Sequence, residues 1–132
     1  MSQPILSVQN VSKCYTRGSE VIEVLRDVNL TIMPGEFVGL IGPNGAGKTT
    51  TVNMLCCLIP PTSGRAWMDG HPIGHHSMQI RERIGLMPEN LPLYEDMTVF
   101  EFLSFCAGIR KIGGREADLR ISEVVEQCRL EK

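Results

Sequence analysis

The sequence predicts an α/β fold, and three consecutive features support that prediction. The run Glu36–Ile41 follows the turn signal Pro34-Gly35 and is typical of a strand buried on both faces at the centre of a parallel sheet. A glycine-rich segment comes next. Beyond it, apolar residues from Val52 to Ile59 recur at helical spacing until Pro60-Pro61 ends the pattern. A buried strand, a glycine-rich loop and a helix in this order are typical of an α/β protein.

The remaining elements are strands before the glycine-rich segment and mixed elements after it. Apolar residues between Ile5 and Val11 predict one strand, and the alternation through 28–32 predicts a second, half-buried strand. Residues 65–73 predict a hairpin closed by Asp69-Gly70. We expect another short strand over residues 84–87 and a loop over residues 88–97.

Two helices are predicted towards the end of the chain. Thr98 and Glu101 form a capping box sequence that starts the first of them, with Met97 and Phe102 placed for a hydrophobic staple. We expect this helix to end near Gly113-Gly114. The second helix has its apolar residues on one face: Ile121, Val124, Val125 and Cys128.

Composition restricts the class of protein. The chain has 132 residues, enough for one modest core, and a net charge of −2, which gives no electrostatic footprint for nucleic acid. No apolar run reaches the roughly 18 residues that a membrane span needs, and no export signal is visible, so we expect a cytoplasmic location. Five cysteines without a Cys-x-x-Cys pair predict reduced thiols. The three histidines, His71, His75 and His76, lack nearby carboxylate or thiol partners, which disfavours a metal site.

The chemistry lies in the glycine-rich segment, which fits Gly-x-x-x-x-Gly-Lys-[Ser/Thr] at every defined position. Glycines let the backbone turn its N–H groups into one concavity, and the helix that starts at Gly47 favours negative charge at its N-terminus. Lys48 supplies a cation for the β- and γ-phosphates, Thr49 is placed to ligate Mg²⁺, and Thr50 can bond an α-phosphate oxygen. The predicted nucleotide site is Gly42, Pro43, Asn44, Gly45, Ala46, Gly47, Lys48, Thr49 and Thr50.

Two other interpretations of this segment are weaker. A match in a chain of this length arises by chance with a probability of roughly half a percent. A dinucleotide site would need a third glycine where Thr50 stands, and it has no place for Lys48. The segment is therefore predicted to be a phosphate-binding loop.

The longer string from Pro34 to Thr50 closely resembles the ATP-binding subunit of ABC transporters, and the resemblance covers the whole chain. Val11–Tyr15, Val24–Leu30, Pro61–Gly64 and Ile84–Pro88 also match that family's landmarks. The resemblance implies a P-loop NTPase (RecA-like) core with an antiparallel β subdomain in residues 1–97. It implies the start of an α-helical subdomain in residues 98–132.

Two residues outside the loop receive roles from this resemblance. Tyr15 would stack on adenine, the alternative being a buried core tyrosine. Glu89 stands where the family usually has a Gln that contacts Mg²⁺ and the attacking water, and a subset, largely export-type systems, is similar in having Glu there. A carboxylate would still ligate Mg²⁺. The alternative for Glu89 is a solvated loop residue.

The resemblance also implies partners. The region Leu91–Ile109 would meet a transmembrane permease subunit, with Phe100, Leu103 and Ile109 either facing it or belonging to the core. A second ATP-binding subunit would complete the site in a dimer. The protein would then lie on the inner face of the cell membrane, bound through its membrane subunit.

Several family motifs have no counterpart in these residues. No apolar strand ends in Asp-Glu, since Leu93–Asp96 has the wrong order, and neither the signature sequence nor the γ-phosphate histidine is present. We therefore expect a truncated, N-terminal fragment that binds ATP without hydrolysing it. The alternatives are an inert nucleotide-binding module and a soluble ABC-superfamily ATPase or small nucleotide kinase. The strand-rich residues before the loop argue against a kinase, and no Asn-Lys-x-Asp sequence supports GTP.

Overall fold

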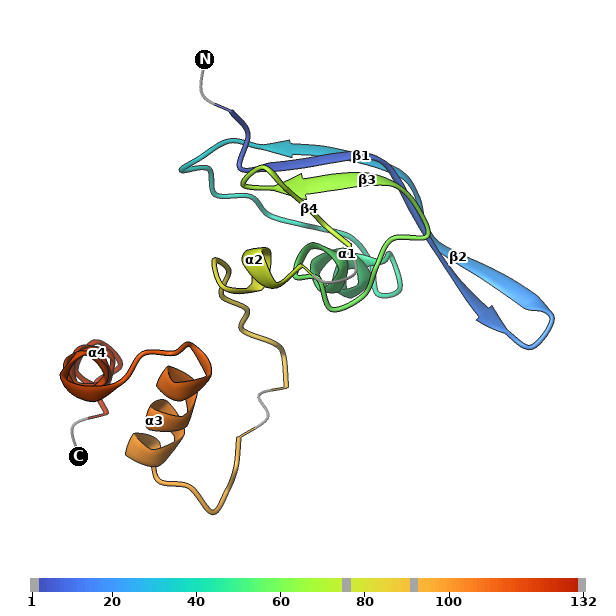
Figure 1. Cartoon of the computed structure of the whole chain (residues 1–132). Helices are drawn as coiled ribbons and strands as arrows, with labels where there is room; N and C mark the ends of the chain where they lie inside the picture. Colours follow the sequence, from blue (N-terminus) through green and yellow to red (C-terminus); the bar gives the residue numbers. More distant parts are fainter. Residues whose placement is uncertain (1–2, 75–76, 91–92, 131–132) are drawn as a thin grey trace. The chain divides into compact units, whose positions relative to one another are not determined.

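The computed structural model describes residues 3–74, 77–90 and 93–130. Its contacts divide the chain into two compact units, Met1–Leu86 and Met87–Lys132. The first unit contains the sheet and helices α1 and α2, and the second contains helices α3 and α4 (Figure 1).

The first unit is built on a four-stranded antiparallel sheet. Its order is β2-β1-β3-β4. The strands are β1 (Leu6–Arg17), β2 (Glu20–Ile32), β3 (Ser63–Met68) and β4 (His71–Pro72). The two predicted N-terminal strands and the hairpin are confirmed, and Asp69 and Gly70 close the hairpin with positive φ angles of 47° and 75°. Such angles in both central residues are those of the turn that matches the twist of a two-residue hairpin.

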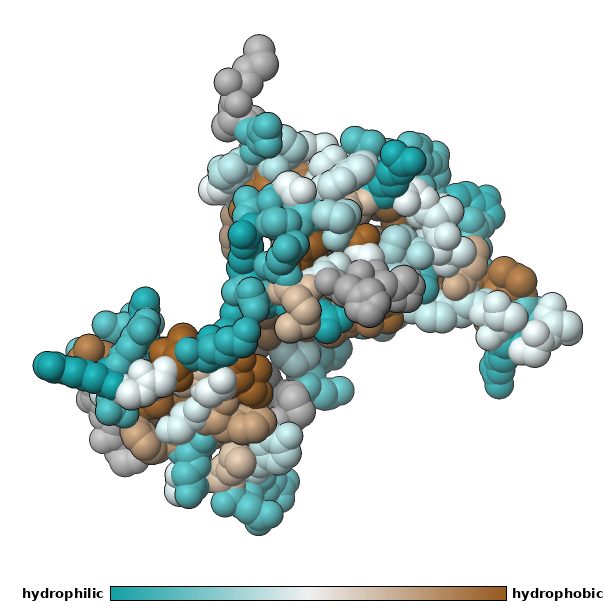
Figure 2. Space-filling model, in the orientation of Figure 1, coloured by the Kyte–Doolittle hydropathy of each residue, from teal (hydrophilic) through white to brown (hydrophobic). Residues whose placement is uncertain are grey.

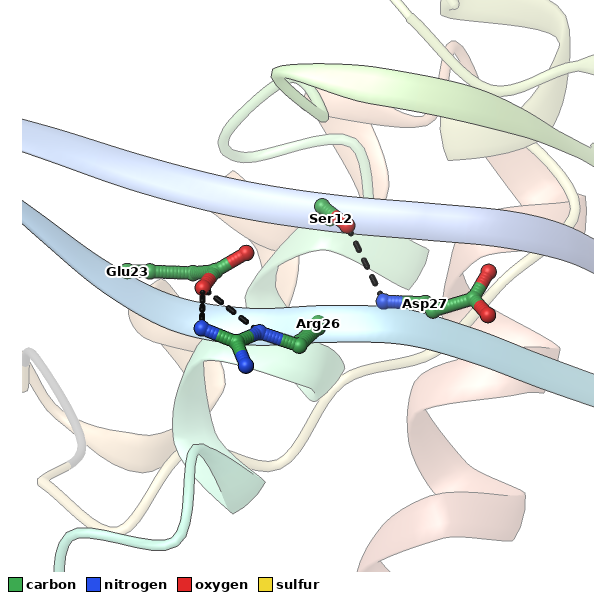
Figure 3. Close-up of polar contacts among 4 residues, drawn as sticks. All are labelled: Ser12, Glu23, Arg26 and Asp27. Carbon is green, nitrogen blue, oxygen red and sulfur yellow. Dashed lines mark hydrogen bonds and ion pairs between the residues drawn. The ribbon is translucent and has the colours of Figure 1, made fainter.

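A pair of irregularities keeps the apolar side of β1 on one face. Val8 and Val11 are both buried although they are three residues apart, which a regular strand would not allow. The register shifts between them, where Asn10 has a φ of 50°, and Asp27 of β2 has a φ of 47°. The Asn10 amide donates a hydrogen bond to the Asp27 carboxylate (2.6 Å), and the Asp27 N–H donates to the Ser12 hydroxyl (3.0 Å; Figure 3). Polar side chains thus stabilise the bulges that the hydrophobic pattern requires.

The same view shows an ion pair on β2 between Arg26 and Glu23 (Figure 3). The hydrogen bond to Glu23, followed by its charge, raises the pKa of Arg26. Because the guanidinium is exposed to solvent, this pair contributes little to stability.

Strand β3 approaches the β1 bulge so closely that only glycine fits at its second residue. A Cβ on Gly64 would lie 2.2 Å from the Asn10 carbonyl oxygen and 2.6 Å from the Val11 Cα. Gly64 also has a φ of 82°, in the left-handed region that glycine alone adopts at no steric cost. The β1–β3 pairing therefore depends on this residue.

Helices α1 (Lys48–Leu55) and α2 (Met78–Arg81) lie on the same side of the sheet (Figure 1). They contribute Met54 and Ile80, both almost completely buried, to the core against the sheet. The other buried core residues come mainly from the strands: Leu6, Val8, Val11, Leu25, Cys57, Ala66 and Ile73. This core holds the beginning of α1, and hence the glycine-rich loop, against β2.

Two predicted strands are wrong. Residues 36–41 and 84–87 are in no strand of the structure. Phe37 and Ile41 are 101% and 95% exposed, where burial on both faces was expected. The physical reason is that a strand of a parallel sheet exists through its neighbours, and the described residues supply no strand that pairs with either segment.

Helix α1 ends earlier than its apolar pattern predicts. The pattern continues to Ile59, but the helix stops at Leu55 because Cys57 has a φ of 59°. The Cys57 N–H bonds the Met54 carbonyl (3.0 Å) and the Leu58 N–H bonds the Asn53 carbonyl (2.9 Å). These two bonds are those of a Schellman motif, here with cysteine at the position that is usually glycine.

The second unit consists of α3 (Val99–Ile109) and α4 (Gly114–Gln127). The capping box is confirmed, because the Glu101 N–H donates to the Thr98 hydroxyl and the Thr98 N–H donates to the Glu101 carboxylate. Helix α3 ends at Ile109, earlier than expected, and a Schellman motif with Lys111 at a φ of 59° follows it.

The predicted apolar face of α4 is only partly covered. Ile121 is buried and Val125 is half-buried, but Val124 and Cys128 are exposed. Tyr94 and Phe105 make an edge-to-face contact with ring centroids 5.8 Å apart. Figure 2 shows apolar side chains on the surface of this unit as well as of the first. Within residues 3–74, 77–90 and 93–130, no helix combines the length and the apolar character needed to cross a membrane.

Candidate functional site

The glycine-rich loop lies at the surface, between residues 36–41 and helix α1. Gly42 to Ala46 are exposed, and Gly45 and Gly47 have φ angles of 82° and 88°. The Ala46 N–H donates to the Pro43 carbonyl (3.2 Å), which closes a turn at the centre of the loop. The positive φ angles give the physical reason for glycine at both positions, of which Gly47 is a defined position of the motif and Gly45 is not.

Gly47 fixes the end of the loop against the sheet. It is buried, and a Cβ there would lie 2.6 Å from the Leu25 side chain and 3.1 Å from the Val24 carbonyl oxygen. The start of α1 therefore packs directly on β2. Gly42 is also confined, since a Cβ on it would lie 3.2 Å from that of Ala46.

Lys48 folds back over the loop. Its ammonium group donates to the carbonyl oxygens of Gly42 (2.7 Å) and Pro43 (2.8 Å). An ammonium group has three N–H donors, so these two carbonyls engage two of them. A positive charge is thus held beside the exposed backbone of the loop, where an anion would bind.

Thr51 fixes the first turn of α1, a role that the sequence analysis missed. It is buried, and both its N–H (2.8 Å) and its hydroxyl (2.9 Å) donate to the Gly47 carbonyl. A threonine four residues after the glycine that begins a helix is the sequence signal for such a double bond.

Electrostatics favours an anion at this end of α1. The helix begins at Gly47, which has no side chain to cap the first N–H groups, and its first turn contains no acidic residue. Those N–H groups have no partner inside the helix and point towards the loop. At the other end, the Arg81 guanidinium donates to the Cys57 carbonyl (2.6 Å), just past the helix. A cation at this end also complements the helix dipole.

Thr49 and Thr50 lie in the first turn of α1, as predicted. Thr49 is exposed and Thr50 is half-buried. Because Thr49 is accessible to solvent, its hydroxyl is open to a hard cation such as Mg²⁺. Their individual roles stay predictions.

Tyr15 lies on β1 and is 42% exposed, so the alternative of a buried core tyrosine is wrong. The Lys13 ammonium is 5.1 Å from the centroid of its ring and also donates to the Pro60 carbonyl (2.7 Å). This arrangement positions one face of the ring with a cation–π contact. An accessible aromatic ring can stack on a base.

Glu89 belongs to the second unit and is exposed. Its exposure fits both a metal ligand and a solvated loop residue, so its role stays a prediction. Of the expected partner region, Leu91 lies outside the described residues, Phe100 and Ile109 are exposed, and Leu103 is half-buried.

The histidines form no metal centre in the part of the chain that the structure describes, which contains no group of three or more potential metal ligands. His71 has its Nε2 atom 2.6 Å from the Arg83 guanidinium, which also pairs with Asp69 (2.6 Å). His75 and His76 lie outside the described residues.

Comparison with protein families gives a match to the family described as ABC transporter over residues 25–132. Phospholipid-transporting ATPase ABCA3 of Homo sapiens is 36% identical over 96% of this chain. The linearmycin resistance ATP-binding protein LnrL of Bacillus subtilis is 33% identical over 92% of it. The probable multidrug ABC transporter ATP-binding protein YbhF of Escherichia coli is 40% identical over 75% of it. The chain spans only 7%, 38% and 17% of these three relatives, respectively.

Solved structures with the same fold are also cassettes of this kind. A structure of an ATP-binding subunit of an ABC transporter matches with a TM-score of 0.80 and 31% identity, over 96% of this chain and 51% of that one. A dimeric ATP-binding cassette in a post-hydrolysis state, bound to ADP and Pi, matches with a TM-score of 0.79 and 29% identity. The second match covers 92% of this chain and 54% of that one.

Proposed function

Because the chain belongs to the ABC transporter family, we propose that it binds ATP as the nucleotide-binding part of an ABC transporter. Its fold is that of the P-loop NTPase cassettes. The whole transporter would couple ATP binding and hydrolysis to transport. Glu89 favours export as the direction of transport, because the family resemblance associates Glu at this position largely with export-type systems.

The observation that supports nucleotide binding most strongly is the construction of the loop. Gly47 is packed on β2 so closely that the start of α1 is fixed, and Lys48 places its charge at the mouth of the loop. Exposed backbone, a helix N-terminus without a side-chain cap and a fixed cation together favour a phosphate chain.

We propose a role in ligand binding for each residue of the site. Gly42–Gly47 and Lys48 would hold the phosphates, Thr49 and Glu89 would ligate Mg²⁺, and Tyr15 would stack on adenine. Mg²⁺ would neutralise the phosphate charge and bridge the β- and γ-phosphates.

The proposed partners follow the family. Two nucleotide-binding subunits would form a dimer, as in the dimeric cassette bound to ADP and Pi, and the region Leu91–Ile109 would meet a membrane permease subunit. This would place the protein on the inner face of the membrane. In this proposal residues 1–97 belong to the β subdomain and core, and residues 98–132 to the helical subdomain.

Binding by the loop is tested with Lys48→Ala. Charge-assisted hydrogen bonds contribute about 1.5–3 kcal/mol, so the variant should bind ATP-Mg²⁺ about 10- to 150-fold more weakly by isothermal titration calorimetry. Arg65→Ala removes the same charge from an exposed position on β3 and should keep wild-type affinity. Equal affinities in Lys48→Ala and the wild type would contradict the proposed site.

Stacking on Tyr15 is tested separately from phosphate binding. Aromatic stacking on a base contributes about 1–3 kcal/mol, so Tyr15→Ala should bind ATP about 5- to 150-fold more weakly, while Tyr15→Phe should bind normally. Neither change should alter the affinity for inorganic tripolyphosphate, which has no base. A parallel loss for tripolyphosphate would indicate damage to the loop instead.

The 132-residue polypeptide is expected to bind ATP without turnover, because its sequence contains no apolar run followed by Asp-Glu. Phosphate release should therefore equal that of Lys48→Ala. Release well above this control would favour an active ATPase over the alternative of an inert nucleotide-binding module.

A further inference from the structure

Tyr15 lies on an arm of β1 and β2 that projects beyond β3 (Figure 1). The pairing of β1 with β3 ends at Ser12, opposite Ser63. Its pairing with β2 continues to Arg17, opposite Glu20. Among the described residues, the arm therefore consists of two strands. Two paired strands are marginally stable by themselves, so a ring on such an arm needs further contacts to hold it in place.

One threonine joins the base of this arm to the segment that follows α1. The Thr62 N–H donates to the Ser12 carbonyl (3.0 Å). The Thr62 hydroxyl accepts from the Cys14 N–H (3.0 Å) and donates more weakly to the Cys14 carbonyl (3.4 Å). It thus pairs both backbone groups of the residue before Tyr15, next to the register shift between Lys13 and Cys14. A hydroxyl both donates and accepts, which an apolar side chain of similar shape cannot do.

Lys13 makes a second connection to the same segment. Its ammonium group contacts the Tyr15 ring, 5.1 Å from the centroid, and donates to the Pro60 carbonyl (2.7 Å). One half-buried cation therefore joins the ring to the chain that leaves α1. Because α1 begins at the glycine-rich loop, these contacts connect the base end of the proposed nucleotide site to its phosphate end.

We propose that Thr62 and Lys13 are positioning residues for Tyr15, which hold its ring where adenine stacks while the glycine-rich loop holds the phosphates. This role rests on the adenine stacking of the proposed function. The Lys13 ammonium lies over one face of the ring, so the base takes the other face. A ring that is already ordered loses less conformational freedom when ATP binds, so binding is stronger. Thr62 and Lys13 act through the ring and not on the nucleotide.

The test compares ATP-Mg²⁺ with inorganic tripolyphosphate, which has no base, by isothermal titration calorimetry of the complete 132-residue chain. Thr62→Val should bind ATP-Mg²⁺ about 2- to 13-fold more weakly, the effect of one lost hydrogen bond. Lys13→Met should bind it about 2- to 5-fold more weakly, the effect of a lost exposed cation–π contact. Both variants should bind tripolyphosphate with wild-type affinity, and neither should lose more ATP affinity than Tyr15→Ala. Thr62→Ser keeps the hydroxyl and should bind ATP like the wild type.

Two further variants separate positioning from general damage. Thr16→Val removes an exposed hydroxyl from the same arm, on the opposite face of β1 from Tyr15, and should keep wild-type affinity for ATP. In a Tyr15→Ala background, Thr62→Val should have no further effect, because there is no ring to position. A further loss in that background, or an equal loss of tripolyphosphate affinity, would overturn the proposal. Unchanged ATP affinity in both Thr62→Val and Lys13→Met would overturn it as well.

Amide exchange without nucleotide tests the arm itself. Amides 14–17 and 20–23 should exchange faster in Thr62→Val than in the wild type. If they exchange at the wild-type rate while Tyr15→Ala binds ATP weakly, the positioning role is wrong and adenine stacking stands. If Tyr15→Ala binds ATP with wild-type affinity, adenine stacking is wrong and the positioning role falls with it.

Discussion

The two units of the molecule obtain their structure in different ways. In Met1–Leu86, strands far apart in the sequence enclose a core in which Val11 and Met54 are completely buried. In Met87–Lys132, Ile121 is the single buried hydrophobic residue among those described, and α3 has none. Local interactions at the helix ends, such as the capping box of α3, are correspondingly more important in the second unit.

This difference predicts which substitutions each unit tolerates. The first unit depends on long-range contacts that allow no added atom, as at Gly64. The second depends on local hydrogen bonds that contribute little individually and respond to pH and backbone conformation. A substitution at a packed position should therefore have a larger effect than one at a helix end.

The largest effect is expected from Gly64→Ala. The new methyl group would lie 2.2 Å from the Asn10 carbonyl oxygen, and the left-handed φ adds strain, so we expect a loss of about 3–5 kcal/mol in the free energy of unfolding. Urea denaturation followed by circular dichroism measures this loss.

Gly18→Ala is the matched control, since Gly18 also has a positive φ of 62° but no atom near the added carbon. Gly18→Ala should lower the free energy of unfolding only by the strain of a left-handed backbone, about 1–2 kcal/mol. Amide exchange in α3 and α4 of Gly64→Ala then tests whether the second unit stays folded when the first is destabilised. Protection that persists there would show that the helices form without the sheet, and protection lost in parallel would show that the units unfold together.

A smaller effect is expected from acid at the start of α3. The hydrogen bond from the Thr98 backbone, followed by that from its hydroxyl, lowers the pKa of Glu101. A carboxyl group whose folded pKa is lowered stabilises the fold above its unfolded pKa of about 4.3, and this contribution is lost as the pH falls through the folded value.

Amide exchange in the first turn of α3 should therefore accelerate between about pH 5 and pH 3, after correction for the intrinsic pH dependence. Glu101→Gln should remove the pH dependence, because its side chain does not titrate in this range. An equal dependence in Glu101→Gln would assign the effect to another group.

The comparison also explains which elements the sequence could predict. Local signals identified the Asp69-Gly70 hairpin, the Thr98–Glu101 capping box and the glycine-rich loop, since each depends on residues close in the chain. The apolar pattern of residues 36–41 described the environment of a strand but could not supply its neighbours. At the site, the close packing of Gly47 on Leu25 joins residues distant in sequence, so pattern alone could not find it.

The ends of α1 and α3 were predicted too late in the sequence, and for one shared reason. Three helices end in Schellman motifs whose left-handed residue is not glycine: Cys57, Lys111 and Arg129. The usual glycine signal is therefore absent at the end of α1, α3 and α4. The last two ends belong to the unit that depends on local interactions.

The smallest effect follows from this observation. Arg129 is exposed and has a φ of 55°, and its N–H bonds the Glu126 carbonyl (3.0 Å). Arg129→Gly removes a left-handed strain of about 1–2 kcal/mol but adds backbone entropy to the unfolded chain, about 0.5–1 kcal/mol. The end of α4 should be stabilised by about 0.5 kcal/mol, measured as slower amide exchange in its last turn. Arg129→Ala keeps the strain and should exchange like the wild type. If alanine slowed exchange as much as glycine did, the gain would come from loss of the arginine side chain, and the backbone strain would not limit this helix.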